Sequence, residues 1–115
     1  MSVQNTYKEL GILDNFPLKN RNTLRLDVMS KYFVEINSLS QLRRLLDSPI
    51  FSNERVCILG GGSNILFNGD YDGLIVKINI LGKKSTHHST QSVILEVHAG
   101  EKWSKLVEYA VKKGW

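Results

Sequence analysis

Short apolar runs separated by polar segments predict a small β-sheet. Tyr32 to Ile36 is rich in aromatic and β-branched residues and predicts a first strand. Val56 to Leu59 is a continuous apolar run, which is typical of a strand covered on both faces in a parallel sheet. The runs Leu74 to Ile78 and Val93 to Val97 predict two later strands. We therefore expect a small sheet with parallel character.

Helical spacing of apolar residues predicts two helices packed on this sheet. Ser38 is placed as an N-cap with Gln41 completing a capping box, and this helix is expected to end near Ser48-Pro49. A second helix is expected from Trp103, which we assign to core packing, to a stop at Gly114. The apolar positions of the two helices are Leu39, Leu42, Leu45 and Leu46, and Leu106, Val107, Ala110 and Val111. The predicted fold class is α+β.

Two polar segments carry no periodic pattern. Residues 1–31 are interpreted as an extended arm or loop, and residues 83–92, KKSTHHSTQS, as a loop. His87 and His88 lie in this loop, where adjacent histidines point in different directions and further metal ligands are lacking. Asp70 and Asp72 are expected to cap a turn. The carboxylate of Glu101 is expected to interact favourably with the positive end of the dipole at the start of the second helix.

Composition narrows the class of protein. The chain has 115 residues, which is the length of one domain or part of one. Its net charge is +4, but the Lys and Arg residues are scattered along the sequence, so a nucleic-acid partner is not expected. No run has the length of a membrane span, and the N-terminus lacks the apolar core of a signal peptide. The single cysteine, Cys57, excludes an internal disulfide and is interpreted as a buried, inert thiol. A cytoplasmic location is expected.

The most distinctive motif follows the second predicted strand. Gly60, Gly61 and Gly62 can adopt positive φ and bring backbone N–H groups against an anion, while Ser63 and Asn64 can add side-chain hydrogen bonds. The segment lacks the last glycine of GxGxxG and the Gly-Lys-Ser/Thr of a P-loop. Local chemistry leaves two interpretations open, a phosphate cradle and a plain tight turn.

Four blocks together resemble a known family. ILGGGSNILF, NTLRLDV at Asn22 to Val28, DYDGLIVKI, and VHAGEKWSKLVEYAVKKGW resemble the N-terminal part of the bacterial UDP-N-acetylenolpyruvoylglucosamine reductases, over about residues 20–115. The resemblance implies part of an FAD-binding domain of the superfamily shared with vanillyl-alcohol oxidase and p-cresol methylhydroxylase. It also implies a division into an N-terminal arm, residues 1–19, and the N-terminal part of the FAD-binding domain, residues 20–115.

The same resemblance implies the chemistry. In the complete enzyme a hydride passes from NADPH to FAD and then to UDP-N-acetylglucosamine enolpyruvate, which yields UDP-N-acetylmuramate for peptidoglycan. The implied FAD-binding residues are Leu59, Gly60, Gly61, Gly62, Ser63, Asn64, Ile65, Ala99 and Gly100, with the glycine loop on the diphosphate and Ala99-Gly100 near the flavin. No residue is assigned a catalytic role, because the family's proton-donating serine lies in a later region, and Ser63 matches the loop instead. The chain alone is therefore expected to be inactive and to bind FAD weakly or not at all.

Two alternatives remain at this stage. One is another FAD-dependent oxidoreductase of the same superfamily, which would lack the NTLRLDV block and often carry a histidine in the loop. The other is a non-catalytic phosphate-binding or interaction module. Because Trp115 directly follows the predicted helix stop, we expect the chain to be part of a longer flavin domain, whose exposed apolar surface would favour self-association.

Overall fold

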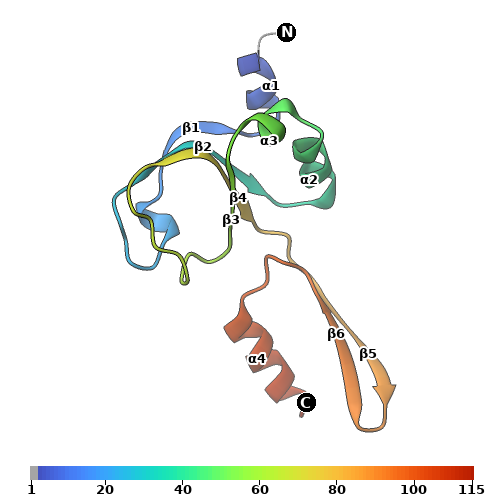
Figure 1. Ribbon diagram of the computed structural model, residues 1–115. Coiled ribbons are helices and arrows are strands. Elements are labelled where there is room, and N and C mark those ends of the chain that lie inside the picture. The colour runs from blue at the N-terminus through green and yellow to red at the C-terminus, as the bar shows by residue number, and fades with distance from the viewer. Residues whose placement is uncertain (1–2) are drawn as a thin grey trace.

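The computed structural model describes residues 3–115 and divides into a sheet with short helices and a separate hairpin with a helix (Figure 1). In chain order the elements are α1 Val3–Glu9, β1 Leu13–Pro17, the 3₁₀ helix η1 Lys19–Arg21, β2 Met29–Ile36, α2 Leu39–Leu46, α3 Pro49–Asn53, β3 Val56–Leu59, β4 Tyr71–Ile78, β5 Lys83–Ser89, β6 Ser92–Val97 and α4 Trp103–Lys112. The first sheet has the order β1-β2-β4-β3, in which β2, β4 and β3 are parallel and β1 is antiparallel to β2. These elements confirm the α+β class and the parallel strands.

The two central strands, β2 and β4, bury side chains on both faces of the sheet. Because successive residues of a strand point to opposite faces, Phe33 and Ile75 lie in one core cluster, whereas Val34 and Val76 lie in the other. α2 and α3 contribute buried residues to the second cluster. Burial on both sides explains the apolar residues of β2 and β4. The expectation of two covered faces is wrong for Val56–Leu59, because β3 is an edge strand and its Ile58 is 59% exposed.

The predicted first helix is confirmed as α2. The Ser38 side chain accepts a hydrogen bond from the Gln41 backbone N–H at 3.2 Å. Gln41 completes the cap one residue further out, since its Oε1 accepts from the backbone N–H of Asn37 at 2.8 Å. The buried apolar face is narrower than predicted, because Leu45 is buried while Leu39 and Leu46 are exposed.

The N-terminal prediction of an arm or loop over residues 1–31 is wrong for α1, β1, η1 and the start of β2, whereas residues 22–28 form a loop as expected. Residues 3–9 form α1, and residues 13–17 form edge strand β1, which pairs with β2. Polar residues in the middle of β1 hide the strand from the hydrophobic pattern, and Asn15 has a positive φ of 47°. Residues 1 and 2 lie outside the described residues. The arm boundary at residue 19 stays a prediction, and the sheet extends across it.

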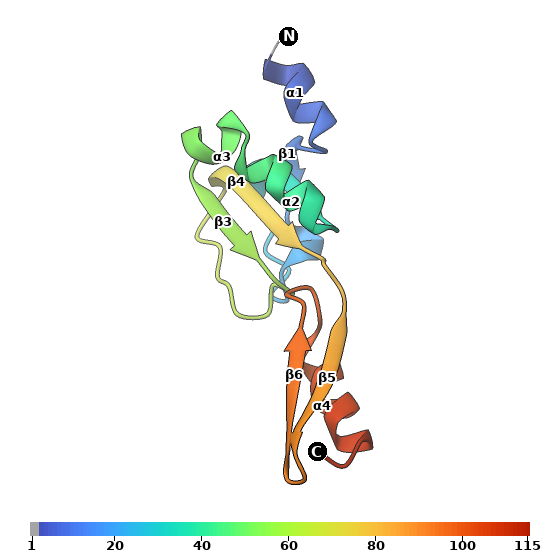
Figure 2. The ribbon, with the colours of Figure 1, turned by 90° about the vertical axis from the view of Figure 1, so that its right-hand side faces the viewer.

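The second part of the molecule is β5, β6 and α4. Residues 83–92, predicted as a loop, instead contain β5 and the turn of an antiparallel hairpin. α4 is confirmed as a helix but lies beside this hairpin rather than on the four-stranded sheet (Figures 1 and 2). Trp103 is 78% exposed, so its assignment to core packing is wrong. Gly114, with φ of 75°, ends α4 as predicted, and the N–H of Trp115 donates to Ala110 O.

The molecule is elongated. Its radius of gyration is 17.2 Å and its extents are 56, 33 and 17 Å, whereas a compact chain of this length has a radius of gyration of roughly 13 Å. In Figure 2 the hairpin and α4 extend from the end of the sheet at which β3 and β4 finish. Residues 77–115 contain no fully buried side chain. The core therefore belongs to the first part alone.

Candidate functional site

The glycine loop, residues 60–64, begins where the parallel strands end. β3 finishes at the buried Leu59, and the loop follows at the carboxyl edge of β3 and β4. This edge is where open α/β sheets bind ligands. A hollow of about 220 Å³ lies there and is lined by residues 58–65. This hollow includes seven of the predicted binding residues, Leu59, Gly60, Gly61, Gly62, Ser63, Asn64 and Ile65.

The backbone of the glycine loop is held through its carbonyl groups. Gly60 O accepts a hydrogen bond from Lys77 Nζ at 2.6 Å, and Gly62 O accepts from the N–H of Thr23 at 3.0 Å. Among the turn and loop backbone hydrogen bonds of residues 3–115, none has its donor in residues 60–64. The backbone N–H groups of the glycine loop therefore have no hydrogen-bond acceptor within the described fold. A run of such donors can bind an anion.

The three glycines have different roles. Gly62 has φ of 76°, and a Cβ there would overlap the backbone of Arg21 and Asn22, so only glycine fits against this segment. A Cβ on Gly60 or Gly61 would meet no atom within 4 Å. Gly62 therefore fastens the glycine loop to the residues after η1, while Gly60 and Gly61 leave the space in front of it open. The turn interpretation describes Gly62, whereas the phosphate cradle at Gly60 and Gly61 stays a prediction.

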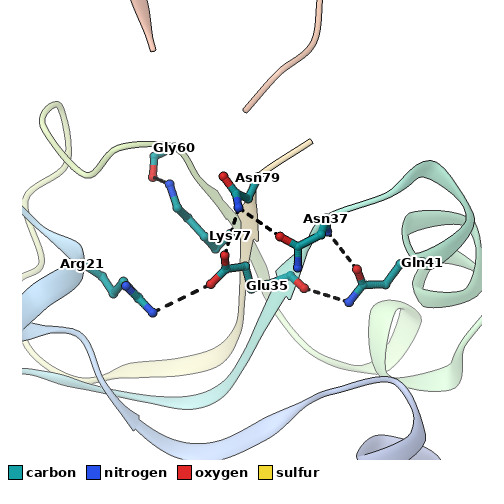
Figure 3. Close-up of polar contacts among 7 residues, drawn as sticks. All are labelled: Arg21, Glu35, Asn37, Gln41, Gly60, Lys77 and Asn79. Atoms are coloured by element: carbon teal, nitrogen blue, oxygen red, sulfur yellow. Dashed lines mark hydrogen bonds and ion pairs between the residues drawn. The ribbon is translucent and has the colours of Figure 1, made fainter. Parts of the chain in front are cut away.

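Charged and amide side chains surround the carboxyl edge of the sheet (Figure 3). Glu35 and Lys77 are opposite each other in the register of β2 and β4. Glu35 Oε2 lies 3.8 Å from Arg21 Nη2, and its Oε1 accepts from Asn79 Nδ2 at 3.2 Å. Arg21 also lies over the Phe33 ring at 5.6 Å. Two cations thus flank one carboxylate next to the glycine loop. Sequence reasoning missed Arg21 and Lys77, although a single lysine within the apolar strand was a usable signal.

Gly100 needs to be glycine for a reason within the protein itself. Its N–H donates to Ile80 O at 2.8 Å, and a Cβ would come within 2.6 Å of Ile80 N. The turn at residues 98–101 is therefore packed against the segment that leaves β4. Ala99 is exposed. A contact of Ala99 and Gly100 with a cofactor stays a prediction, and the Gly100 N–H is already used.

Two acidic residues have partners other than those expected. Asp70 Oδ1 accepts from the backbone N–H of Met29 at 2.8 Å, so it joins the start of β2 to β4 instead of capping its own turn. Glu101 Oε1 accepts from the Gly82 N–H at 2.9 Å and holds the base of the hairpin, while α4 begins later, at Trp103. Asp72 is exposed.

The remaining candidates do not form a reactive centre. Cys57 is a half-buried free thiol, and burial raises its pKa, which lowers its thiolate content at neutral pH. His87 and His88 lie in β5, and no group of three or more potential metal-binding side chains occurs in the part of the chain described. His98 is exposed, and its Nδ1 lies 3.0 Å from Leu81 O, as expected for a hydrogen-bonded histidine.

A larger hollow lies elsewhere. It has about 600 Å³ and is lined by residues of α1, β1 and β2, among them Tyr7, Asp14 and Tyr32. It contains none of the predicted binding residues. The volume of this hollow alone does not make it the functional site, since the glycine loop with its free N–H donors does not line it.

Comparisons with known proteins agree with this geometry. The chain is 33% identical over 107 residues to the UDP-N-acetylenolpyruvoylglucosamine reductase of Paraburkholderia phymatum, covering 93% of this chain and 31% of that protein. The reductase of Chromobacterium violaceum is 35% identical over 98 residues, covering 85% of this chain and 29% of the relative. That of Flavobacterium johnsoniae is 36% identical over 102 residues, covering 89% and 30%. The chain therefore spans about 30% of the length of these relatives.

The family itself is established by a match that covers most of the chain. The model of the family described as "FAD binding domain" matches residues 30–115, from the start of β2 through α4. This range contains the glycine loop, Lys77 in β4 and the turn at residues 98–101. The chain belongs to the FAD binding domain family.

Proposed function

We propose that this chain holds the diphosphate of FAD in the glycine loop, as part of a flavin-dependent UDP-N-acetylenolpyruvoylglucosamine reductase. The observation that carries the proposal is that the backbone N–H groups of residues 60–64, at the carboxyl edge of β3 and β4, have no acceptor within the described fold. Dinucleotide diphosphates bind to converging N–H groups of this kind. The family match and the three named relatives support FAD as the ligand.

The size of the hollow suits a diphosphate. Its volume of about 220 Å³ is below the roughly 300–1,000 Å³ of pockets that enclose a whole small-molecule ligand. The diphosphate would lie against the N–H groups of Gly61 and Ser63, and the Lys77 ammonium, bound to Gly60 O, would lie on the other side of the Gly60–Gly61 peptide. Leu59 and Ile65 border the hollow, and the remainder of the cofactor would extend beyond it, toward the proposed contacts at Ala99 and Gly100.

Bound FAD would supply the hydride-transfer chemistry, and the residues of this chain would bind and orient it. Gly60 and Gly61 leave room for close approach, and Gly62 fastens the glycine loop to Arg21 and Asn22 at the end of η1. We assign no proton donor. Ser63 is exposed and belongs to the loop, and burial raises the pKa of the Cys57 thiol, which disfavours its thiolate.

The complete reaction is proposed from the relatives. We propose NADPH as the electron donor and UDP-N-acetylglucosamine enolpyruvate as the substrate, with UDP-N-acetylmuramate as the product. This step would serve peptidoglycan synthesis, and through it cell-wall formation, cell shape and cell division, in the cytoplasm. Among the described residues, no helix has the length and apolarity that a membrane span requires. Because the chain spans 31% of its first relative and contributes no assigned catalytic group, we expect no substrate-dependent NADPH oxidation from the 115-residue chain.

A second candidate is a non-catalytic module that binds nucleoside diphosphates in general. The small hollow favours this candidate, because its volume suits a diphosphate and is too small to enclose a flavin or a base. A preference for FAD over ADP would arise only from contacts outside the hollow. The two functions therefore differ in the ligand that binds more tightly.

Flavin fluorescence during titration tests the proposal. FAD is expected to bind the chain weakly, since the chain spans 31% of its first relative, and riboflavin, which lacks the diphosphate, is expected to bind at least 10-fold more weakly still, because charged hydrogen bonds are lost. Gly61→Val adds bulk where a Cβ meets open space, so this variant is expected to fold and to lose FAD binding. Its thermal unfolding midpoint is the control for folding. Equal binding of FAD and riboflavin, or full binding by the folded variant, would contradict the proposal, and ADP binding as tight as FAD would favour the module.

A further inference from the structure

We infer that Lys77 is a positioning residue that sets the direction of the N–H groups in the glycine loop and adds an unpaired positive charge for a diphosphate ligand. The inference rests on the proposed function and adds a residue that the sequence analysis did not assign. Lys77 lies in β4, and the residue opposite it in β3 is Leu59, the last residue before the glycine loop. Its side chain therefore starts beside the loop it contacts (Figure 3).

The Lys77 contact acts through peptide geometry. In a trans peptide the C=O of one residue and the N–H of the next point in opposite directions within one plane. Lys77 Nζ holds Gly60 O at 2.6 Å, so the N–H of Gly61 is directed away from Lys77. In the same way the bond from Thr23 N–H to Gly62 O directs the N–H of Ser63 away from Thr23. Two carbonyl anchors thus turn two N–H donors away from the body of the protein.

The charge of Lys77 is not paired with a carboxylate. None of the ion pairs within 4.0 Å among the described residues includes Lys77. Glu35, its neighbour across the strands, is engaged by Arg21 and Asn79 instead. The acceptor that Lys77 does contact is a neutral carbonyl, so an anion held by the Gly61 N–H would lie across the Gly60–Gly61 peptide from a cation whose charge no carboxylate offsets. Such a charge attracts the anion through space, and salt screens that attraction.

Amide chemical shifts of the chain during titration with ADP provide the test, because they detect weak binding residue by residue. ADP is expected to shift the amide signals of the glycine loop, and adenosine, which lacks phosphate, is expected to leave them unchanged. Lys77→Met is expected to weaken ADP binding about 10-fold, and Lys77→Arg by less than about 3-fold. Lys84→Met is the matched control, since Lys84 is an exposed strand lysine in β5. The wild-type affinity should also fall more steeply with salt than that of Lys77→Met.

Lys77→Gln separates position from charge. It keeps a donor for Gly60 O without the charge, so we expect reduced ADP affinity with a weak salt dependence, and it replaces Lys77→Met if that variant does not fold. Full affinity in Lys77→Gln would overturn the role of the charge. If the wild-type loop responds to ADP while Lys77→Met equals Lys84→Met, the inference on Lys77 fails and the proposed function stands. If the wild-type loop responds to neither ADP nor FAD, the proposed function itself fails.

Discussion

Gly62 is the residue of the glycine loop on which the local fold depends most. Its φ of 76° is unfavourable for any residue with a Cβ, and an added Cβ would overlap the Arg21 carbonyl group. We expect Gly62→Ala to lower the free energy of unfolding by roughly 2–4 kcal/mol, from left-handed strain and overpacking together. Urea unfolding followed by circular dichroism measures this change.

Gly61→Ala is the matched control for Gly62→Ala, because its Cβ would meet no atom within 4 Å. It should change the free energy of unfolding by less than about 1 kcal/mol. Equal destabilisation by the two substitutions would mean that the contact between Gly62 and the residues after η1 does not hold the glycine loop in place.

The same loop shows how far single residues could be predicted. The run of glycines predicted either an anion cradle or a tight turn, because both need flexible backbone at a strand end. The division of roles among the glycines was not predictable, because it depends on Arg21, which lies some forty residues earlier in the chain and contacts Gly62 only in the folded protein. The Lys77 anchor depends equally on strand register, which the sequence does not specify.

At the scale of elements, the two parts of the molecule should differ in local stability. β2 and β4 bury residues on both faces, whereas β5, β6 and α4 contain no fully buried residue. An isolated hairpin is only marginally stable in water. We therefore expect the amides of β5 and β6 to exchange with solvent deuterium at least 100-fold faster than those of β4, in line with the wide spread of local opening free energies. Hydrogen exchange read by mass spectrometry tests this.

β1 provides the internal comparison for the exchange experiment, because it is also an edge strand but pairs with the buried β2. Its inward-bonded amides should be protected to an intermediate degree. Protection of β5 and β6 equal to that of β4 would contradict the view that the hairpin lacks a core of its own.

Burial also explains which elements could be predicted. β3 begins and ends where the apolar run does, at Val56 and Leu59, and most of β4 and β6 was found in the same way. β5 was missed because KKSTHHS is polar on both faces, and its pairing with β6 arises from backbone bonds that leave no hydrophobic pattern. α4 was found from its periodicity, but its place beside the hairpin was not, since an apolar face does not identify its partner.

At the scale of the whole molecule, the exposed apolar surface should govern association in solution. Trp103 and Val111 are 78% and 68% exposed on α4, Val107 lies between them on the same helix face, and Ile94 of β6 is 55% exposed. Contiguous apolar surface of this kind favours association. We expect the weight-average sedimentation coefficient of the chain to rise with concentration.

The double variant Val107→Lys/Val111→Lys should remove most of that rise, because it places two charges in the stripe without touching a buried residue. Leu24→Lys is the control, since Leu24 is 63% exposed but lies in the loop after η1. A loss of association in Leu24→Lys alone would place the contact on the first part of the molecule, near the glycine loop. A sedimentation coefficient that stays constant with concentration in the unmodified chain would contradict this prediction. It would mean that Trp103, Val107 and Val111 of α4 remain exposed to water without causing association. Neither the elongated shape nor the exposed tryptophan would then require a partner surface.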